Sequence, residues 1–411
     1  MVDLTDVTTA RTASRHDAAD RRARIDAIPS ASGALIPLTT VSAVAWRGLG
    51  ERAIEPNAYY LPDWELAVNA SAPGRTGASA LVAFNEAPPL QLIGVMPVVS
   101  LWRACKIPLP ALVSAHPYGT LCTPLIDRDM ADAAAAQLMQ QARTAGARAL
   151  ILREVALDGP AMRAFTDSLA RDGARARVLQ SHVRACLDAT RDGETLLRDA
   201  LGGKKLKELR RQRHRLAEHG AVRFEVAQSP ADVAAAAETF LALEASGWKG
   251  QRGTVLIQVE GDAAFIRRAA KALAETGQCE IVTLRAGDTP VAAGIVLRHQ
   301  TRAFFFKLGV DERFAKFSPG VQLTLELTRH LCADPAIRFA DSTAAPDHPM
   351  INPIWRGRLA IGDVLIPLQR RDVVVPLIRA ALALRQAIRE PARRAVHFLR
   401  QYRQGRQEMS T

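Results

Sequence analysis

The most informative stretch of this chain runs from Phe304 to Leu323 and reads FFFKLGVDERFAKFSPGVQL. Its apolar start predicts a strand that runs into a loop. Ser318 as cap and Pro319 in the first turn predict that a helix begins there. The first amides of a helix lack partners within it and the helix dipole is positive at this end, so such a start binds anions. Arg313 and Lys316 add positive charge, and the stretch suits a pyrophosphate; an ordinary capped helix is the alternative.

The sequence around this stretch predicts two similar halves. Each half reads as a strand, two helices, an antiparallel meander, a helix and a last strand. This order favours an α+β fold with mixed, mainly antiparallel sheets and flanking helices. Expected strands lie at 80–85, 90–99, 149–155, 222–227, 279–284, 291–297, 303–310, 337–341 and 359–368. Expected helices lie at 41–53, 131–145, 204–219, 263–276 and 319–332, and Ser229-Pro230 opens another.

The length of 411 residues predicts two domains and two flanking segments. Residues 1–34 read as a disordered tail, and 35–190 and 191–370 as the two domains. In the first domain, Asp127-Arg128-Asp129 precedes the helix at 131–145, and this acidic entry predicts that no anionic donor binds there. Residues 371–411 read as a basic amphipathic helix, interrupted at Pro391.

Charge and cysteine content limit the class of protein. The net charge of +12 is concentrated at 204–218, with seven Lys/Arg against two acidic residues, and at 371–411, with nine Arg against three. Such segments favour anionic partners, namely CoA phosphates, nucleic acid or a lipid surface, or are solvated helix faces. Five scattered cysteines without a CxxC pair favour the reducing cytoplasm. The histidines are scattered and form no HxxxH pair, so no metal site is expected. The Walker loop and the GxGxxG motif of nucleotide-binding proteins do not appear either.

Several stretches in order resemble the GNAT superfamily of acyltransferases. More specifically, they are similar to the CelD-like group associated with cellulose biosynthesis, distant relatives of the FemAB transferases. The resemblance covers about residues 35–367. The matching pieces are Pro56-Asn57-Ala58-Tyr59-Tyr60 with Trp64, Gly94-Val95-Met96-Pro97, Tyr118-Gly119, KKLKELRR at 204–211, LEASGWKG at 243–250, and Lys307 to Gly320.

The resemblance implies two tandem GNAT-like domains and acetyl-CoA or another acyl-CoA as co-substrate. It implies that the CoA pyrophosphate lies where Pro319 starts a helix, with Ser318, Gly320 and Val321 around it. It also implies that the thioester lies where the strand 303–308 splays from 337–341. A backbone amide among Leu308, Gly309 and Val310 then faces the acyl carbonyl oxygen.

Three residues are candidates for the base that takes the acceptor's proton. Asp341 ends the last core strand, where burial can raise the pKa of a carboxyl group. Glu244 ends a helix that, by resemblance, lines the acceptor site, and Trp248 and Lys249 are expected to shape that site. His348 lies in a proline-rich loop. For each residue the alternative is a structural role: a capping aspartate, a helix end with a packed tryptophan, or a surface histidine.

Three functions remain open at this point. The leading one is transfer of an acyl group from acyl-CoA to an amine or hydroxyl, with a small-molecule or saccharide acceptor, in polysaccharide or cell-envelope biosynthesis. The second is a FemAB-like transferase that uses aminoacyl-tRNA, since 204–215 is basic. The third is a non-catalytic scaffold held at the inner face of the membrane by residues 371–411, which combine arginines with apolar residues. No DNA partner is expected.

Overall fold

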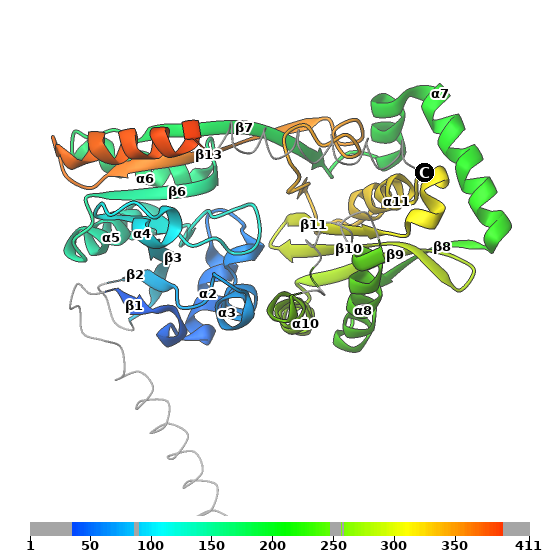
Figure 1. Cartoon of the computed structure of the whole chain (residues 1–411), viewed down its shortest axis with the longest axis horizontal. Helices are drawn as coiled ribbons and strands as arrows, with labels where there is room; N and C mark the ends of the chain where they lie inside the picture. The colour runs from blue at the N-terminus through cyan, green and yellow to red at the C-terminus, as the bar shows by residue number, and fades with distance from the viewer. Residues whose placement is uncertain (1–34, 86–89, 247–255, 257–258, 389–411) are drawn as a thin grey trace, which may run out of the picture. The chain divides into compact units, whose positions relative to one another are not determined.

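One mixed sheet of thirteen strands runs through the residues described by the computed structural model, which are 35–85, 90–246, 256 and 259–388 (Figure 1). The strand order is β1-β2-β3-β4-β6-β13-β7-β12-β11-β10-β9-β8, with β5 paired to β3. The strands are β1 (Ile36–Pro37), β2 (Ser79–Phe84), β3 (Leu92–Ser100), β4 (Ala111–Ser114), β5 (Leu125–Ile126), β6 (Ala149–Ala156), β7 (Arg177–Asp188), β8 (Val222–Ala227), β9 (Cys279–Ala286), β10 (Thr289–His299), β11 (Arg302–Val310), β12 (Phe339–Asp341) and β13 (Gly357–Pro367).

Most neighbouring strands are antiparallel, and only β4 with β6 and β11 with β12 are parallel. The meander β8–β11 follows from short turns, such as the one in which Gly287 has a φ of 59°. The predicted α+β class with a mixed, mainly antiparallel sheet is therefore confirmed. The strands at 177–188 and 111–114 and the helix at 160–171 were not predicted from the sequence.

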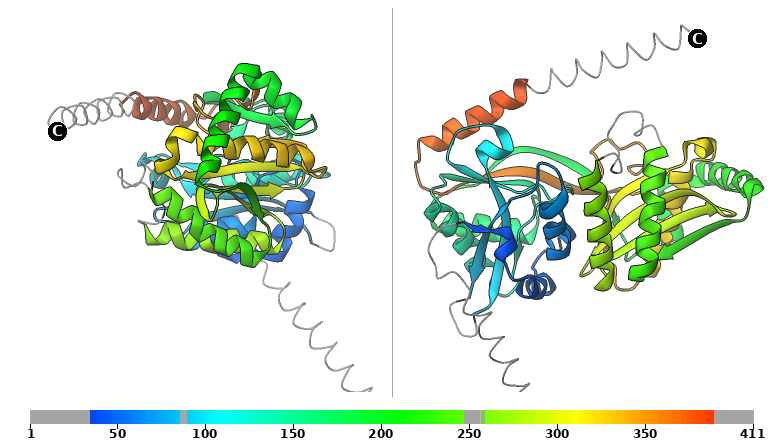
Figure 2. Two further views of the ribbon diagram at one scale, coloured as in Figure 1. Left: turned by 90° about the vertical axis from the view of Figure 1, so that its right-hand side faces the viewer. Right: turned by 60° about the horizontal axis from the view of Figure 1, so that its bottom comes forward.

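Helices cover both faces of the sheet (Figures 1 and 2). In the second half, α8 and α10 pack on one face and α7 and α11 on the other. The helices are α2 (Ala43–Arg52), α3 (Pro62–Ser71), α4 (Leu101–Cys105), α5 (Ala131–Thr144), α6 (Pro160–Arg171), α7 (Gly193–Leu216), α8 (Pro230–Ser246), α10 (Glu260–Glu275) and α11 (Pro319–Ala333), with short 3-10 turns η1 (Leu38–Thr40), η2 (Ala58–Tyr60), η3 (Ala217–His219) and η5 (Glu312–Phe317).

Strand β13 returns from the second half of the sequence to the sheet of the first half. It pairs antiparallel with β6 on one side and with β7 on the other. In Figure 1, β7 and β13 run side by side as one long ribbon. The described residues from Leu35 to 388 belong to one compact unit. The predicted division into 35–190 and 191–370 stays a prediction, and β13 crosses that boundary.

The two halves also share an aromatic core. Trp64 of α3 packs edge-on against Phe265 of α10, with ring centroids 4.9 Å apart. Gly261 permits this approach, because a Cβ at that position would lie 2.3 Å from the carbonyl oxygen of Ser71. The first half therefore contributes packing next to the second half's helices.

His299 at the end of β10 is a buried polar link to the first half. Its Nδ1 accepts a hydrogen bond from the backbone N–H of Asn57 at 2.9 Å, and Nε2 lies 2.8 Å from the carbonyl oxygen of Gly50. The neutral ring with a proton on Nε2 satisfies both contacts. Burial lowers the pKa of His299 to about 4.

Mild acid is expected to weaken the folded state through His299. Its folded-state pKa lies below the unfolded value of 6.5, so the unfolded chain binds more protons between pH 6.5 and 4. Stability is thus lost as the pH falls, by about 2 kcal/mol between pH 7 and pH 5. Urea unfolding at both pH values measures this loss. His299→Gln should show a smaller pH dependence, and an unchanged dependence in this variant would contradict the assignment.

The predicted helix 204–219 is present as the second part of a longer helix. Helix α7 begins at Gly193, where Asp192 caps it by accepting the amide of Thr195. Gly202 interrupts the helix with a φ of 68°, and the predicted segment is the part that follows this kink. Gly220 ends it as expected, after the short turn η3.

Part of the predicted C-terminal helix lies within the described residues. Residues 374–388 are helical, and Ile378 is buried against the sheet near Leu365. Leu377 and Leu384 on the outer side are exposed. Pro391 and the rest of the segment lie outside the described residues. Among the described helices, none is long and apolar enough to cross a membrane.

Candidate active site

The candidate site lies where β11 and β12 separate. The two strands pair over three residues, from Arg302 with Phe339 to Phe304 with Asp341. Strand β11 then continues to Val310, whereas β12 ends. The chain leaves β12 through Thr343, whose φ is 50° and whose hydroxyl donates to the carbonyl oxygen of Phe305 at 2.6 Å. The splay that the resemblance implied is therefore present.

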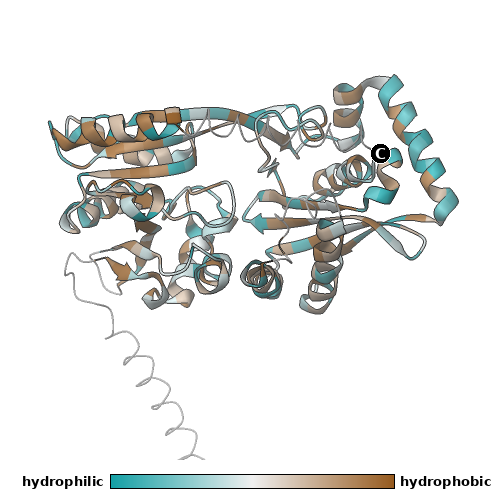
Figure 3. Cartoon of the chain, in the orientation of Figure 1, coloured by the Kyte–Doolittle hydropathy of each residue, from teal (hydrophilic) through white to brown (hydrophobic). Residues whose placement is uncertain are grey.

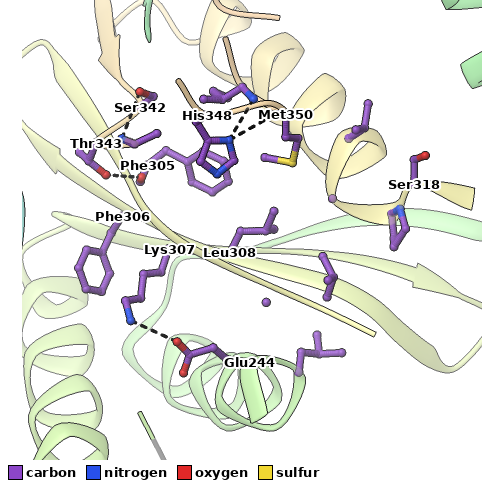
Figure 4. Close-up of a pocket in the computed structure, with 18 of the residues that line it drawn as sticks. Glu244, Phe305, Phe306, Lys307, Leu308, Ser318, Ser342, Thr343, His348 and Met350 are labelled. Carbon is purple, nitrogen blue, oxygen red and sulfur yellow. Dashed lines mark hydrogen bonds and ion pairs between the residues drawn. The ribbon is translucent and has the colours of Figure 1, made fainter. Parts of the chain in front are cut away.

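A cavity of about 490 Å³ fills this splay (Figure 4). Its walls are β11, the chain after β12, the end of α8 and the start of α11. The lining residues are Leu243, Glu244, Phe305, Phe306, Lys307, Leu308, Gly309, Val310, Glu312, Ala315, Ser318, Pro319, Gly320, Val321, Ser342, Thr343, Ala344, His348, Met350 and Ile351.

The start of α11 opens on the same cavity, but Ser318 does not cap the helix as predicted. Ser318 has a left-handed backbone, with φ 54° and ψ 53°, and its hydroxyl accepts no amide of the helix. Its own N–H donates to Ala315, and the first helical bond runs from Gln322 to the Ser318 carbonyl. Proline at 319 has no N–H, so the amides of Gly320 and Val321 begin the helix without a side-chain cap.

Gly320 lies at a crowded but adaptable point of this helix start. A Cβ there would lie 3.0 Å from Leu308 Cδ2, 3.2 Å from Val310 Cγ1 and 3.3 Å from Met350 Sδ. All three atoms are ends of side chains. Glycine thus keeps the approach to the first amides open.

Glu244 reaches the cavity because α8 lies very close to β11. Gly309 permits this, since a Cβ at 309 would lie 2.8 Å from the backbone nitrogen of Glu244. The carboxylate is 2% exposed, accepts the amide of Leu256 at 2.9 Å and lies 3.2 Å from Lys307 Nζ. Figure 4 shows this ion pair inside the cavity. A carboxylate and an ammonium group therefore face the same space.

Lys307 also lies close to two aromatic rings. Its Nζ is 5.7 Å from the ring centroid of Tyr118 and 6.0 Å from that of Phe306. The hydroxyl of Tyr118 donates to Asp262 at 2.7 Å, and burial followed by the Asp262 contact raises the pKa of Tyr118. The tyrosine comes from the first half of the sequence, so that half contributes to the surroundings of Lys307.

His348 lines the cavity on the side opposite β11. Its Nδ1 lies 3.3 Å from the amide nitrogen of Met350 and 3.4 Å from that of Ile351, and accepts from both. This contact places the ring proton of the neutral histidine on Nε2. His348 is therefore arranged as a hydrogen-bond donor through Nε2 more than as a proton acceptor.

Asp341 lies behind the cavity and is not among the residues that line it. Its side chain is fully buried and forms an ion pair with the equally buried Arg184 at 2.5 Å. Its other oxygen accepts the amide of Thr343 at 2.9 Å. Arg184 also donates to the carbonyl oxygen of Thr120 at 2.6 Å. The carboxylate thus holds the turn at which the strands separate.

The four remaining predicted site residues do not line the cavity or lie outside the described residues. Arg313 and Lys316 do not line the cavity: Arg313 pairs with Asp311 at 2.7 Å, and Lys316 lies over the ring of Phe317. Their part in binding the donor stays a prediction, since both lie in the turn η5 just before α11 but are not among the residues that line this cavity. Trp248 and Lys249 lie outside the described residues.

Sequence reasoning missed three residues of the site: Lys307, Thr343 and Tyr118. Lys307 belongs to the stretch that predicts the strand and the helix start, but no role was predicted for it. A charged residue among the apolar positions of a strand is the signal that could have indicated a site residue. Tyr118 could not be connected to the site, because its contacts depend on pairing between the two halves. Among the described residues, no cluster of three or more His, Cys, Asp or Glu could hold a metal ion.

Comparisons with known proteins agree with this geometry. The family described as "Acetyltransferase (GNAT) domain" matches residues 203–347, from α7 to the turn after β12. No curated protein matches the sequence. Among solved structures, FemX is similar with a TM-score of 0.54 at 11% identity, covering 82% of this chain and 98% of FemX.

Two further structures are similar. The C-terminal domain (DUF2156) of a putative lysylphosphatidylglycerol synthetase from Agrobacterium fabrum has a TM-score of 0.50 at 14% identity, over 83% of this chain and 95% of that one. A tandem GNAT protein from the clavulanic acid biosynthesis pathway has a TM-score of 0.38 at 15% identity, over 82% and 99%. The chain thus has an α+β fold of the GNAT type, and its residues 203–347 match the acetyltransferase (GNAT) domain family.

Proposed function

We propose that this chain transfers an acyl group from acyl-CoA to an amine or hydroxyl of a second substrate. One observation carries the proposal: the cavity between the splayed strands opens onto the uncapped first amides of α11. Those amides suit the diphosphate of the donor. The splay gives the thioester access to the backbone of β11.

The donor is proposed to lie along β11, from the start of α11 toward the splay. Its diphosphate takes the amides of Gly320 and Val321. A backbone amide among Leu308, Gly309 and Val310 donates to the carbonyl oxygen of the acyl group. A preorganised donor of this kind stabilises the oxyanion by about 3–4 kcal/mol. The cavity volume of about 490 Å³ is in the range of small-molecule sites.

Glu244 is proposed as the group that removes the acceptor's proton. The acceptor nitrogen or oxygen attacks the thioester carbon, the carbon–sulfur bond breaks, and the proton moves to the Glu244 carboxylate. CoA leaves as a thiolate that takes a proton from water. Glu244 is favoured over Asp341 and His348 because it faces the cavity, whereas Asp341 binds Arg184 and His348 presents Nε2–H.

The acceptor class follows from the resemblance to the CelD-like group and is our proposal. A small molecule or a saccharide carrying an amine or hydroxyl fits the role, in polysaccharide or cell-envelope biosynthesis. Lys307, between Glu244 and Tyr118, is placed to bind an anionic group of such an acceptor. A cytoplasmic location, with contact to the inner membrane face through residues 371–411, is proposed on the same basis.

The donor site is tested by two variants at Gly320. CoA or acetyl-CoA is expected to raise the melting temperature of the wild type, since a ligand at 100 times its Kd adds about 2.7 kcal/mol of stability. Gly320→Glu places an anion beside the diphosphate and should raise the Kd at least about tenfold. At the same CoA concentration, this lowers the added stability to about 1.4 kcal/mol or less, so at least about half of the shift is lost.

Gly320→Gln is the matched control, because it adds the same bulk without the charge. We expect it to keep more of the CoA-induced shift than Gly320→Glu. Equal shifts in the wild type and both variants would place CoA elsewhere or show that it does not bind, and would reject the proposed donor site.

Aminoacyl-tRNA remains a second candidate donor, favoured by the basic surface of α7. Its residues Lys204, Lys205, Lys207 and Arg210 are exposed. Retention of tRNA that falls steeply with salt would support this candidate. Tight CoA binding without tRNA retention would exclude it.

A further inference from the structure

A second cavity of about 380 Å³ lies between the end of α7 and the turn η5. It is separate from the splay described above and is strongly polar. Its lining residues are Glu208, Arg211, Gln212, Arg215, Glu218, His219, Lys316 and Phe317. Neither Lys316 nor any residue of α7 touches the first cavity, so this space needs its own explanation.

Two cations of this second cavity, Arg215 and Lys316, form no close ion pair with a described carboxylate, although Glu208 and Glu218 line the same cavity. Arg211 is neutralised by Glu208, with two contacts of 2.9 Å. Within the described part of the chain, however, no carboxylate lies at ion-pair distance from Arg215 or Lys316. The cavity thus presents one ammonium and one guanidinium group outside ion-pair distance, and its lining carries three Lys or Arg against two Glu.

Aromatic packing fixes the wall that carries these cations. The ring of His219 lies against Phe314 and Phe317, with centroids 5.3 and 5.4 Å apart, and Lys316 Nζ lies 4.9 Å from the centre of the Phe317 ring. His219 gains a positive charge when it is protonated. The rings of this wall are therefore packed together, while the side chains of Arg215 and Lys316 are exposed.

The two cavities share η5 as a common wall. Glu312, Ala315 and Ser318 line the first cavity, whereas Lys316 and Phe317 line the second. Phe317 is only two residues before Pro319, where α11 starts. The same short turn therefore separates the proposed position of the diphosphate from the second cavity.

The surface beyond the second cavity is also basic. The part of α7 after Gly202 turns its leucines inward and exposes Lys204, Lys207, Arg210 and His214. Figure 3 shows this segment as predominantly hydrophilic. An anionic ligand is therefore attracted to the second cavity and held there by nearby charge.

We propose that the second cavity binds a phosphate monoester or diester of the nucleotide part of the donor, with Arg215 and Lys316 as its ligands. The inference rests on the proposed function. In CoA the 3′-phosphate is attached to the same ribose as the diphosphate, three carbon atoms away. A guanidinium with a neighbouring ammonium matches the oxygen atoms of a phosphate group. In an RNA donor the same site takes a backbone phosphate.

The test compares CoA with 3′-dephospho-CoA on the full chain, because these ligands differ only in the phosphate. The wild type should bind CoA about tenfold more tightly. In Arg215→Ala, and in the double variant Arg215→Ala/Lys316→Ala, this ratio should fall to about one while dephospho-CoA binding stays unchanged. Isothermal titration at two salt concentrations measures the affinity of each of the three proteins for each of the two ligands.

Arg210→Ala is the matched control, since Arg210 lies on the same helix but does not line the cavity. Its CoA to dephospho-CoA ratio should equal that of the wild type. Arg215 is exposed, and the melting temperatures of the free variants show whether they remain folded. A variant that unfolds is replaced by Arg215→Gln, which removes the charge and keeps a polar side chain.

The remaining outcomes separate the inference from the proposed function. If CoA binds but the wild type does not distinguish it from dephospho-CoA, the inference fails and the function stands. A second outcome is that tRNA binds and CoA does not, and that Arg215→Ala weakens tRNA binding more than Arg210→Ala does. The phosphate site then stands with RNA as the source of the phosphate, and the acyl-CoA proposal fails. If neither ligand binds, both fail.

Discussion

Glu244→Gln is expected to lower kcat about 100- to 10 000-fold, which is the usual contribution of a general base. Glutamine keeps the size of the side chain and still accepts the amide of Leu256 through its oxygen. It cannot take a proton from the acceptor. Binding of the donor should change little, because the donor contacts lie on β11 and α11. Steady-state kinetics with the free thiol of CoA as readout measures the effect.

Glu238→Gln is the matched control for this experiment. Glu238 lies on the same helix, but it is on the surface and pairs with Arg267 at 2.6 Å. We expect wild-type kcat in this variant. If Glu244→Gln also kept a wild-type kcat, Glu244 would not be the base, and the ion pair with Lys307 would instead be a structural contact. A Glu244 variant that raises only KM would indicate acceptor binding.

Asp341→Ala is expected to destabilise the fold by about 3–5 kcal/mol, because it leaves the guanidinium of Arg184 buried without a counter-charge. Both side chains are fully buried, so water cannot replace the missing partner. The free energy of unfolding in urea measures this loss. The variant should also disturb the turn at which β11 and β12 separate, since the amide of Thr343 loses its acceptor.

A double variant decides whether Asp341 is structural or catalytic. Asp341→Leu/Arg184→Met removes both charges and keeps the volume, so it should recover most of the stability lost in Asp341→Ala. Substantial activity in the stable double variant would establish a structural role. A stable double variant with kcat reduced as far as in Glu244→Gln would return Asp341 to the position of base.

Local patterns predicted most elements of the second half. The alternating run at 222–227, the turn at Gly287 and the Ser229-Pro230 start of α8 are all present in the structure, where Asp232 donates its amide to Ser229. These features depend on residues within one or two turns of one another. The helix start at Pro319 and the splay beside it were expected for the same reason and from the resemblance.

Features that depend on distant parts of the chain were not predicted. Strand β7 was missed because its outer part carries arginine, glutamine and histidine and lacks the usual alternation. The directions of Arg313 and Lys316 depend on a 3-10 turn, which a loop sequence does not reveal. The hydroxyl of Ser318 does not cap because its backbone is left-handed, although serine usually caps.

The position of β13 sets an order for synthesis on the ribosome. The strand lies between β6 and β7, so each of these strands lacks its neighbour on that side until residues 357–367 have been translated. More than 160 residues separate the end of β7 from the start of β13. Nascent chains that stop before Gly357 therefore carry two open strand edges, which are prone to pair with other chains. Translational arrest before residue 357 would leave an aggregation-prone product, whereas synthesis through residue 367 supplies the strand that closes both edges.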